Sequence, residues 1–240
     1  MYPVKKLVNP PIKEAIISIS FTGVEATRLS EFCEIVKQDY PKQKGMYELT
    51  ARFQNEELSS EGSKLVGHQV LSNDERQMIT LRVNTISFHR IEPYNNWEEL
   101  KEESEKYFAL FNTLFPNLEI TEIGTRYINA LKLAMNENEG FSKYLKLLPQ
   151  LPDDLPKAVE SYFLQIRIPK PEQGLSSVIT QYFNQTDIPN TVEIILDIHA
   201  FKQIENNNTD IWNSLELLRA FKNDIFFNSI TDVTKTLYND

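Results

Sequence analysis

The sequence predicts an α+β protein with an internal duplication, in which two βαβββα halves carry antiparallel sheets that each pack on a long helix. Two observations indicate this fold class. The order strand, helix, three strands, long helix runs through residues 13–116 and again through 117–240, behind an N-terminal arm at 1–12. The two long helices also share a Trp-x-x-Leu pattern near their starts. We therefore expect one compact unit whose halves are related by a pseudo-two-fold axis.

The first half begins with a strand, because apolar and polar residues alternate through residues 13–21. Apolar residues at helical spacing follow over 25–40, and Pro41 forbids continuation of that helix. Three further strands are predicted at residues 46–53, 66–71 and 78–91. The apolar set of the last strand changes face near Asn84-Thr85, which predicts a bulge or bend there.

A long helix over residues 96–115 closes the first half. Asn96 can cap it, and Glu99 stands at the spacing of a capping box. Four acids occupy its first turns, where the helix dipole favours negative charge: Glu98, Glu99, Glu102 and Glu103. We expect this acidic run to be a solvated face and not a binding site.

The second half repeats the order of the first. Residues 122–133 alternate as a strand, 141–148 predict a short helix, and 210–230 predict the second long helix. Three strands lie between these helices, at residues 159–168, 175–183 and 192–201. Trp97-x-x-Leu100 and Trp212-x-x-Leu215 then align the two long helices, with both tryptophans predicted to be buried.

Composition excludes several classes of function. The net charge of −9 argues against a duplex-binding surface, so nucleic acid is an improbable partner. A single cysteine, Cys33, excludes an intramolecular disulfide and a thiolate zinc site, and we expect no metal and no cofactor. The start of the chain has no apolar stretch behind its lysines, and no apolar run is long enough for a membrane span. We expect a cytoplasmic protein.

The candidate ligand-binding residues form one polar set near strand positions. Its members are Arg126, Glu14, Asn129, His89, Arg90 and Asp197. In one interpretation Arg126 anchors an anion or a peptide carboxylate. In the other, which we favour, Arg126 and Glu14 form a structural ion pair between equivalent strands. No catalytic residue is predicted, because the sequence has no phosphate loop and no nucleophile elbow.

Several short motifs resemble a family of prokaryotes. They are Pro10-Pro11-x-x-Glu14, Tyr94-x-x-Trp97, Gly124-x-Arg126-Tyr127-Ile128-Asn129, Leu196-Asp197-Ile198 and Phe227-x-x-Ile230-Thr231. Together they resemble a sporadically distributed conserved hypothetical family of uncharacterised function, over nearly the whole chain. The resemblance implies no known reaction. The patchy distribution of that family suggests mobile, antiphage-defence or toxin–antitoxin neighbourhoods.

These observations favour a non-enzymatic binding or adaptor protein. We expect another protein as its partner, with a homo-oligomer as the alternative partner, and no membrane. The alternative function is a sensor, or an enzyme with a cryptic site, that binds a small anionic ligand around Arg126. A recombinant chain free of metals and nucleotides would favour the first function, and a ligand bound against Arg126 would favour the second.

Overall fold

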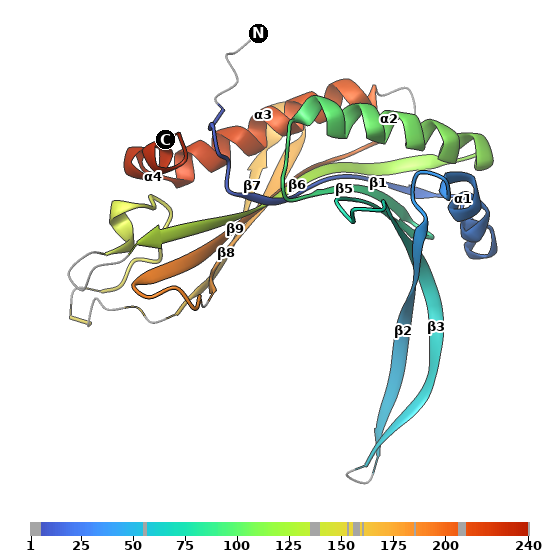
Figure 1. Cartoon of the computed structure of the whole chain (residues 1–240), viewed down its shortest axis with the longest axis horizontal. Coiled ribbons are helices and arrows are strands. Elements are labelled where there is room, and N and C mark those ends of the chain that lie inside the picture. Colours follow the sequence, from blue (N-terminus) through green and yellow to red (C-terminus); the bar gives the residue numbers. More distant parts are fainter. Residues whose placement is uncertain are drawn as a thin grey trace. The chain divides into compact units, whose positions relative to one another are not determined.

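The computed structural model describes residues 6–54, 57–134, 140–152, 154–155, 159, 161–184, 186–205 and 210–239, with the backbone alone for 50–54 and 57–61. The chain divides into two compact units. The split unit contains Met1–Ala15 and Ile123–Asp240, and the continuous unit contains Ile16–Glu122. Both units combine helices with antiparallel strands, which confirms the predicted mixed class (Figure 1).

The continuous unit has the strand order β2-β3-β4-β5-β1. Its elements are β1 (Ile12–Thr22, which begins in the split unit), η1 (Ala26–Arg28), α1 (Leu29–Val36), β2 (Lys42–Gln54), β3 (Glu57–Leu71), β4 (Gln77–Arg82), β5 (Thr85–Ile91) and α2 (Trp97–Leu114). The predicted strand over 78–91 is therefore wrong. A turn at Val83–Asn84 divides it into β4 and β5, which pair antiparallel, so the change of apolar face marks a hairpin and not a bend. This half has four strands after α1, where three were predicted.

Helix α2 begins where the sequence predicts. The Asn96 side chain accepts a hydrogen bond from the Glu99 backbone N–H at 2.8 Å, and its amide donates to the Glu99 carboxylate at 2.7 Å. The core of this unit centres on Phe111 of α2. The rings of Phe21 and Phe32 both lie 5.3 Å from the Phe111 ring, so that β1, α1 and α2 meet at one aromatic cluster.

The hairpin of β2 and β3 extends beyond the other strands of its unit, and we call it the ribbon (Figure 1). Its two strands pair from Lys42–Leu71 to Gln54–Glu57, whereas β4 joins β3 only along Gly67–Leu71. At Gly67 an added Cβ would lie 2.2 Å from the Leu81 carbonyl oxygen. Only glycine permits β3 and β4 to come this close where the ribbon leaves the sheet.

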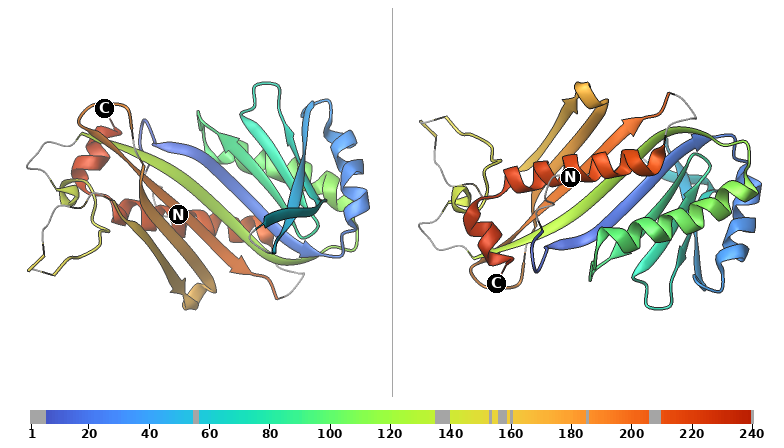
Figure 2. Two further views of the ribbon diagram at one scale, coloured as in Figure 1. Left: turned by 90° about the horizontal axis from the view of Figure 1, so that it is seen from below. Right: turned by 90° about the horizontal axis from the view of Figure 1, so that it is seen from above.

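The split unit has the strand order β6-β9-β8-β7. Its elements are β6 (Glu119–Ala134, which begins in the continuous unit), η2 (Phe141–Lys143), β7 (Phe163–Lys170), η3 (Pro171–Gln173), β8 (Leu175–Asn184), β9 (Thr191–Gln203), α3 (Ile211–Ser229) and α4 (Asp232–Leu237). Helix α3 contacts β9 (Figure 2). Alternate residues of β6 are buried as predicted, among them Ile123, Tyr127 and Leu131.

Two sequence predictions need correction here, and one helix was not predicted. The helix predicted at 141–148 is only the single turn η2, because Leu145 pairs with Ile230 as an isolated β-bridge. Helix α4 follows the second long helix and was not predicted. Both tryptophans were predicted to be buried, but Trp97 is buried and Trp212 is only half-buried. Trp97 is the first residue of α2, whereas Trp212 is the second residue of α3, so the two side chains point in different directions around their helix axes.

Candidate functional site

Arg126 of β6 is held by a carboxylate of the neighbouring strand β9. Its Nε donates to both carboxylate oxygens of Asp197, at 2.9 and 3.1 Å, and one Nη donates at 2.5 Å. Asp197 is nearly buried, with 11% of its side chain exposed, whereas 47% of the Arg126 side chain is exposed. The pair raises the pKa of the guanidinium above its ordinary value, through the hydrogen bonds to Asp197. Arg126 therefore already donates hydrogen bonds to a carboxylate of the same sheet, that of Asp197.

Arg126 has a hydrogen-bond partner other than the predicted Glu14. Asp197 accepts its hydrogen bonds, and Glu14 adds an electrostatic attraction that also raises the pKa of the guanidinium. Arg126 lies on the more open face of β6. His199 stands two residues from Asp197 on β9, and burial lowers the pKa of its imidazole. The sequence analysis included Asp197 among the candidate residues and in the motif Leu196-Asp197-Ile198. It did not predict that β6 and β9 are neighbouring strands.

Asn129 does not belong to this cluster. Residues 126 and 129 lie on opposite faces of a strand, and Asn129 is buried on the face that carries Tyr127. Its side-chain amide donates to the carbonyl oxygens of Leu196 at 2.9 Å and Tyr127 at 3.3 Å. Asn129 therefore stabilises the sheet and is not available to a ligand there.

Tyr127, from the same motif, faces a buried lysine. Lys222 of α3 is 6% exposed, and its Nζ lies 3.4 Å from the centroid of the Tyr127 ring. Burial, together with the positive charge of Arg219, lowers the pKa of Lys222 to about 7. The ring face offers the ammonium a cation–π contact in place of a carboxylate. The sequence analysis did not single out Lys222, because a lysine between apolar residues of an amphipathic helix resembles an exposed position.

His89 and Arg90 belong to the continuous unit, where Arg90 has a structural partner. Its guanidinium donates to Glu103 of α2, and both side chains are 11% exposed. The Tyr40 hydroxyl donates to the same carboxylate, and burial raises the pKa of Glu103 and of Tyr40. The solvated acidic face predicted for α2 is therefore wrong at Glu103, since this residue sits at helical spacing with the buried Leu100 and Tyr107.

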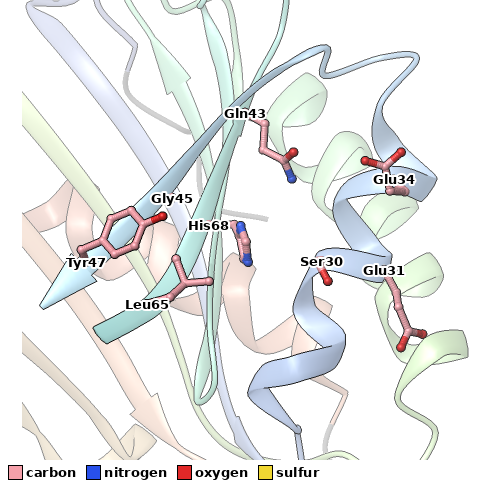
Figure 3. A pocket seen from close by; sticks show the side chains of 8 residues that line it. All are labelled: Ser30, Glu31, Glu34, Gln43, Gly45, Tyr47, Leu65 and His68. Atoms are coloured by element: carbon pink, nitrogen blue, oxygen red, sulfur yellow. The ribbon is translucent and has the colours of Figure 1, made fainter. Parts of the chain in front are cut away.

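A cavity of about 480 Å³ lies between α1 and the base of the ribbon (Figure 3). Its lining comes from three elements of the continuous unit: Ser30, Glu31 and Glu34 of α1, Gln43, Gly45 and Tyr47 of β2, and Leu65 and His68 of β3. None of these residues was a predicted site residue. Their separation along the chain conceals the site, since the cavity exists only where the ribbon passes α1.

The cavity combines an aromatic wall with an acidic one. A Cβ at Gly45 would lie 2.9 Å from Cε2 of Tyr47, so the ring rests over a position that has no side chain. Glu31 pairs with Arg28 at 3.2 Å and Glu34 pairs with Lys37 at 3.0 Å, within α1 and its first turn. Burial lowers the pKa of His68, which favours the neutral imidazole at neutral pH. The chemistry of the cavity is acidic and aromatic.

Comparison with known proteins adds no function. No protein-family model matches the sequence, and no curated protein shows significant similarity to it. The resemblance carried by the Gly-x-Arg-Tyr-Ile-Asn motif therefore stays a prediction. In the part of the chain that the structure describes, no helix is long and apolar enough to cross a membrane. The same described residues contain no group of three or more potential metal ligands.

Proposed function

We propose that the chain is a non-enzymatic protein-binding module whose partner packs on the ribbon. The observation that carries this proposal is an exposed apolar stripe on one face of the ribbon. Tyr47, Leu49 and Leu65 are 62%, 74% and 42% exposed, although strands normally bury one face. Tyr47 and Leu65 are paired across the two strands, and Leu49 follows Tyr47 on the same face.

The structure of the ribbon suits a partner of protein size. Strand β2 ends the strand order of its unit, so its outer edge is unpaired within the described sheet. An isolated two-stranded hairpin is only marginally stable in water, and a partner covering its apolar face would stabilise it. Contiguous exposed apolar side chains are typical of protein interaction sites. We take the occupant to be a polypeptide segment of another protein that carries basic residues, since the cavity at the base of this face has two carboxylates.

The alternative, an anion site around Arg126, has less support. A ligand carboxylate that bound the Nε edge of the guanidinium would have to displace Asp197, which makes three hydrogen-bond contacts to Arg126 there. Displacing Asp197 would leave a nearly buried carboxylate with water in place of its cation, which costs about 1–2 kcal/mol because the pair is half-exposed. The pair therefore favours a structural role for Arg126 and a binding function elsewhere.

Partner binding can be tested by placing a photoreactive amino acid at Leu49 and crosslinking in extracts of the source cells. The crosslinked protein is identified by mass spectrometry and purified, and its Kd for the full chain is measured. The triple variant Tyr47→Ser, Leu49→Ser, Leu65→Ser should weaken binding at least tenfold. The matched control is Leu110→Ser with Leu217→Ser, which removes exposed leucines from α2 and α3. Equal losses in both variants, or a crosslink only to a second copy of the chain, would contradict the proposal.

We also infer that the two units arose by duplication. Strands β3-β4-β5-β1 in one unit and β7-β8-β9-β6 in the other follow the same spatial order, with β2 as an additional strand. Aligning the long helices on their caps, Asn96 and Asp210, places each buried residue of α2 on a buried residue of α3. The matched pairs are Trp97 with Ile211, Leu100 with Ser214, Ser104 with Leu218, Tyr107 with Phe221, Phe108 with Lys222 and Phe111 with Ile225. Superposition of the units in an experimental structure tests this inference.

A further inference from the structure

We propose that the cavity between α1 and the ribbon receives a basic side chain, arginine or lysine, of the bound partner. The inference rests on the proposed protein-binding function and adds the chemistry of recognition. The cavity lies on the face of the ribbon that carries Tyr47 and Leu65, so a segment packed on that face would pass over its opening (Figure 3).

The size of the cavity suits a long side chain. At about 480 Å³ it falls within the range of cavities that hold small ligands. An arginine or lysine can lay its apolar stem along Leu65 and the Tyr47 ring and carry its charge inward. Gly45 keeps the space beneath the ring open, because any side chain there would meet the ring.

Electrostatics favours a cation over an anion or a neutral group. The described residues that line the cavity include two carboxylates and no lysine or arginine. A neutral His68 imidazole offers an acceptor nitrogen, and the Gln43 and Ser30 side chains offer acceptor oxygens. The exposed face of an aromatic ring attracts a cation through its quadrupole. A carboxylate ligand would meet Glu31 and Glu34 at this site, whereas their partners Arg28 and Lys37 are not among the described residues that line the cavity.

The present partners of the two carboxylates can be exchanged. Arg28 and Lys37 are 40% and 64% exposed, and each pairs with its glutamate three positions away along the chain. Exposed pairs of this kind are worth little because water and salt compete for both charges. A guanidinium or ammonium from a partner, shielded by the Tyr47 ring, would therefore replace them at small cost.

The test uses small probes with the intact chain. N-acetyl-arginine amide and N-acetyl-lysine amide are titrated separately against the isotope-labelled protein, and N-acetyl-citrulline amide serves as the neutral probe. The expected result is saturable NMR shift changes at Gly45, Leu65 and His68 with one or both cationic probes, and none with citrulline. The relative response to the two cations identifies the preferred side chain. Shift changes that are equal for citrulline, or absent for both cations, would overturn the inference.

Matched variants then separate the cavity from the ribbon. Glu31→Gln with Glu34→Gln should weaken probe and partner binding at least tenfold. Glu98→Gln with Glu102→Gln removes the same charge from the exposed face of α2 and should leave both unchanged. Partner binding that depends on Tyr47, Leu49 and Leu65 but ignores Glu31 and Glu34 would refute the cavity inference and leave the proposed function standing. Binding that ignores the three ribbon residues would refute the proposed function itself.

Discussion

At the scale of single residues, two arginine–carboxylate pairs differ in how much water they retain. Arg90 and Glu103 are both nearly buried, whereas Arg126 is half-exposed beside a nearly buried Asp197. Removing one member of a buried pair leaves an uncompensated charge, while an exposed pair is largely replaced by water. The two pairs should therefore respond differently to the same substitution.

Arg90→Met should lower the free energy of unfolding by about 3–5 kcal/mol, because Glu103 would remain buried beside Tyr40 without its cation. The double variant Arg90→Met, Glu103→Met should recover much of this loss. Urea unfolding of both variants measures the difference. A double variant as unstable as the single one would show that the packing of Arg90, and not its charge, stabilises the unit.

Arg126→Ala should cost less, about 1–2 kcal/mol, since half of the guanidinium is solvated and Asp197 can recruit water. Under the proposed function the ribbon and not Arg126 carries partner binding, so partner binding should be unaffected. The two readouts are unfolding in urea and the Kd of the partner. A stable variant that has lost its partner would restore the anchor hypothesis for Arg126.

Lys222 gives a pH dependence with a definite sign. Its pKa is about 7 in the folded chain, against 10.5 for an ordinary lysine. The unfolded chain therefore binds more protons between these values, so stability rises as pH increases from about 7 to 10.5. Each pKa unit corresponds to about 1.4 kcal/mol. Lys222→Met should flatten this rise and stabilise the protein at pH 7, in unfolding curves compared with the exposed control Lys132→Met.

At the scale of elements, the sequence predicted the type of nearly every helix and strand but not their pairing. Alternation and capping are local signals, and they located β1, β6, α2 and α3 to within a few residues. The division of 78–91 and the loss of the helix at 141–148 depend on tertiary contacts that periodicity does not record. The hydrogen-bond partner of Arg126 was missed for the same reason, because the bond from Arg126 to Asp197 depends on which strands are neighbours.

The close approach at Gly67 makes a prediction about the base of the ribbon. Gly67→Ala would place a Cβ against the Leu81 carbonyl, a backbone atom that cannot rotate away. We expect a loss of about 1–3 kcal/mol, as for other overpacked sites. Gly140→Ala is the control, since its nearest atom would lie at 3.7 Å, and it should stay within about 0.5 kcal/mol of wild type. Equal melting temperatures for the two variants would contradict the crowding seen at Gly67.

At the scale of the whole molecule, the two units differ in the number of chain segments that form them. Residues 16–122 form one unit without interruption, whereas the other needs both ends of the chain. The N-terminal arm is bonded to residues more than a hundred positions away. The Ala130 N–H donates to the Pro11 carbonyl at 2.8 Å, and the Asn9 N–H donates to the Tyr238 carbonyl at 2.8 Å.

This connectivity limits the order in which the two units can fold on the ribosome. Domains generally fold as units while the chain emerges. All of residues 16–122 are made before Ile123, where the second segment of the split unit begins. The continuous unit can therefore form before the split unit. The arm, which leaves the ribosome before residues 16–122, can form these hydrogen bonds only after Ala130 and then Tyr238 have been made. Residues synthesised ahead of the continuous unit thus reach their final partners after that unit has been made.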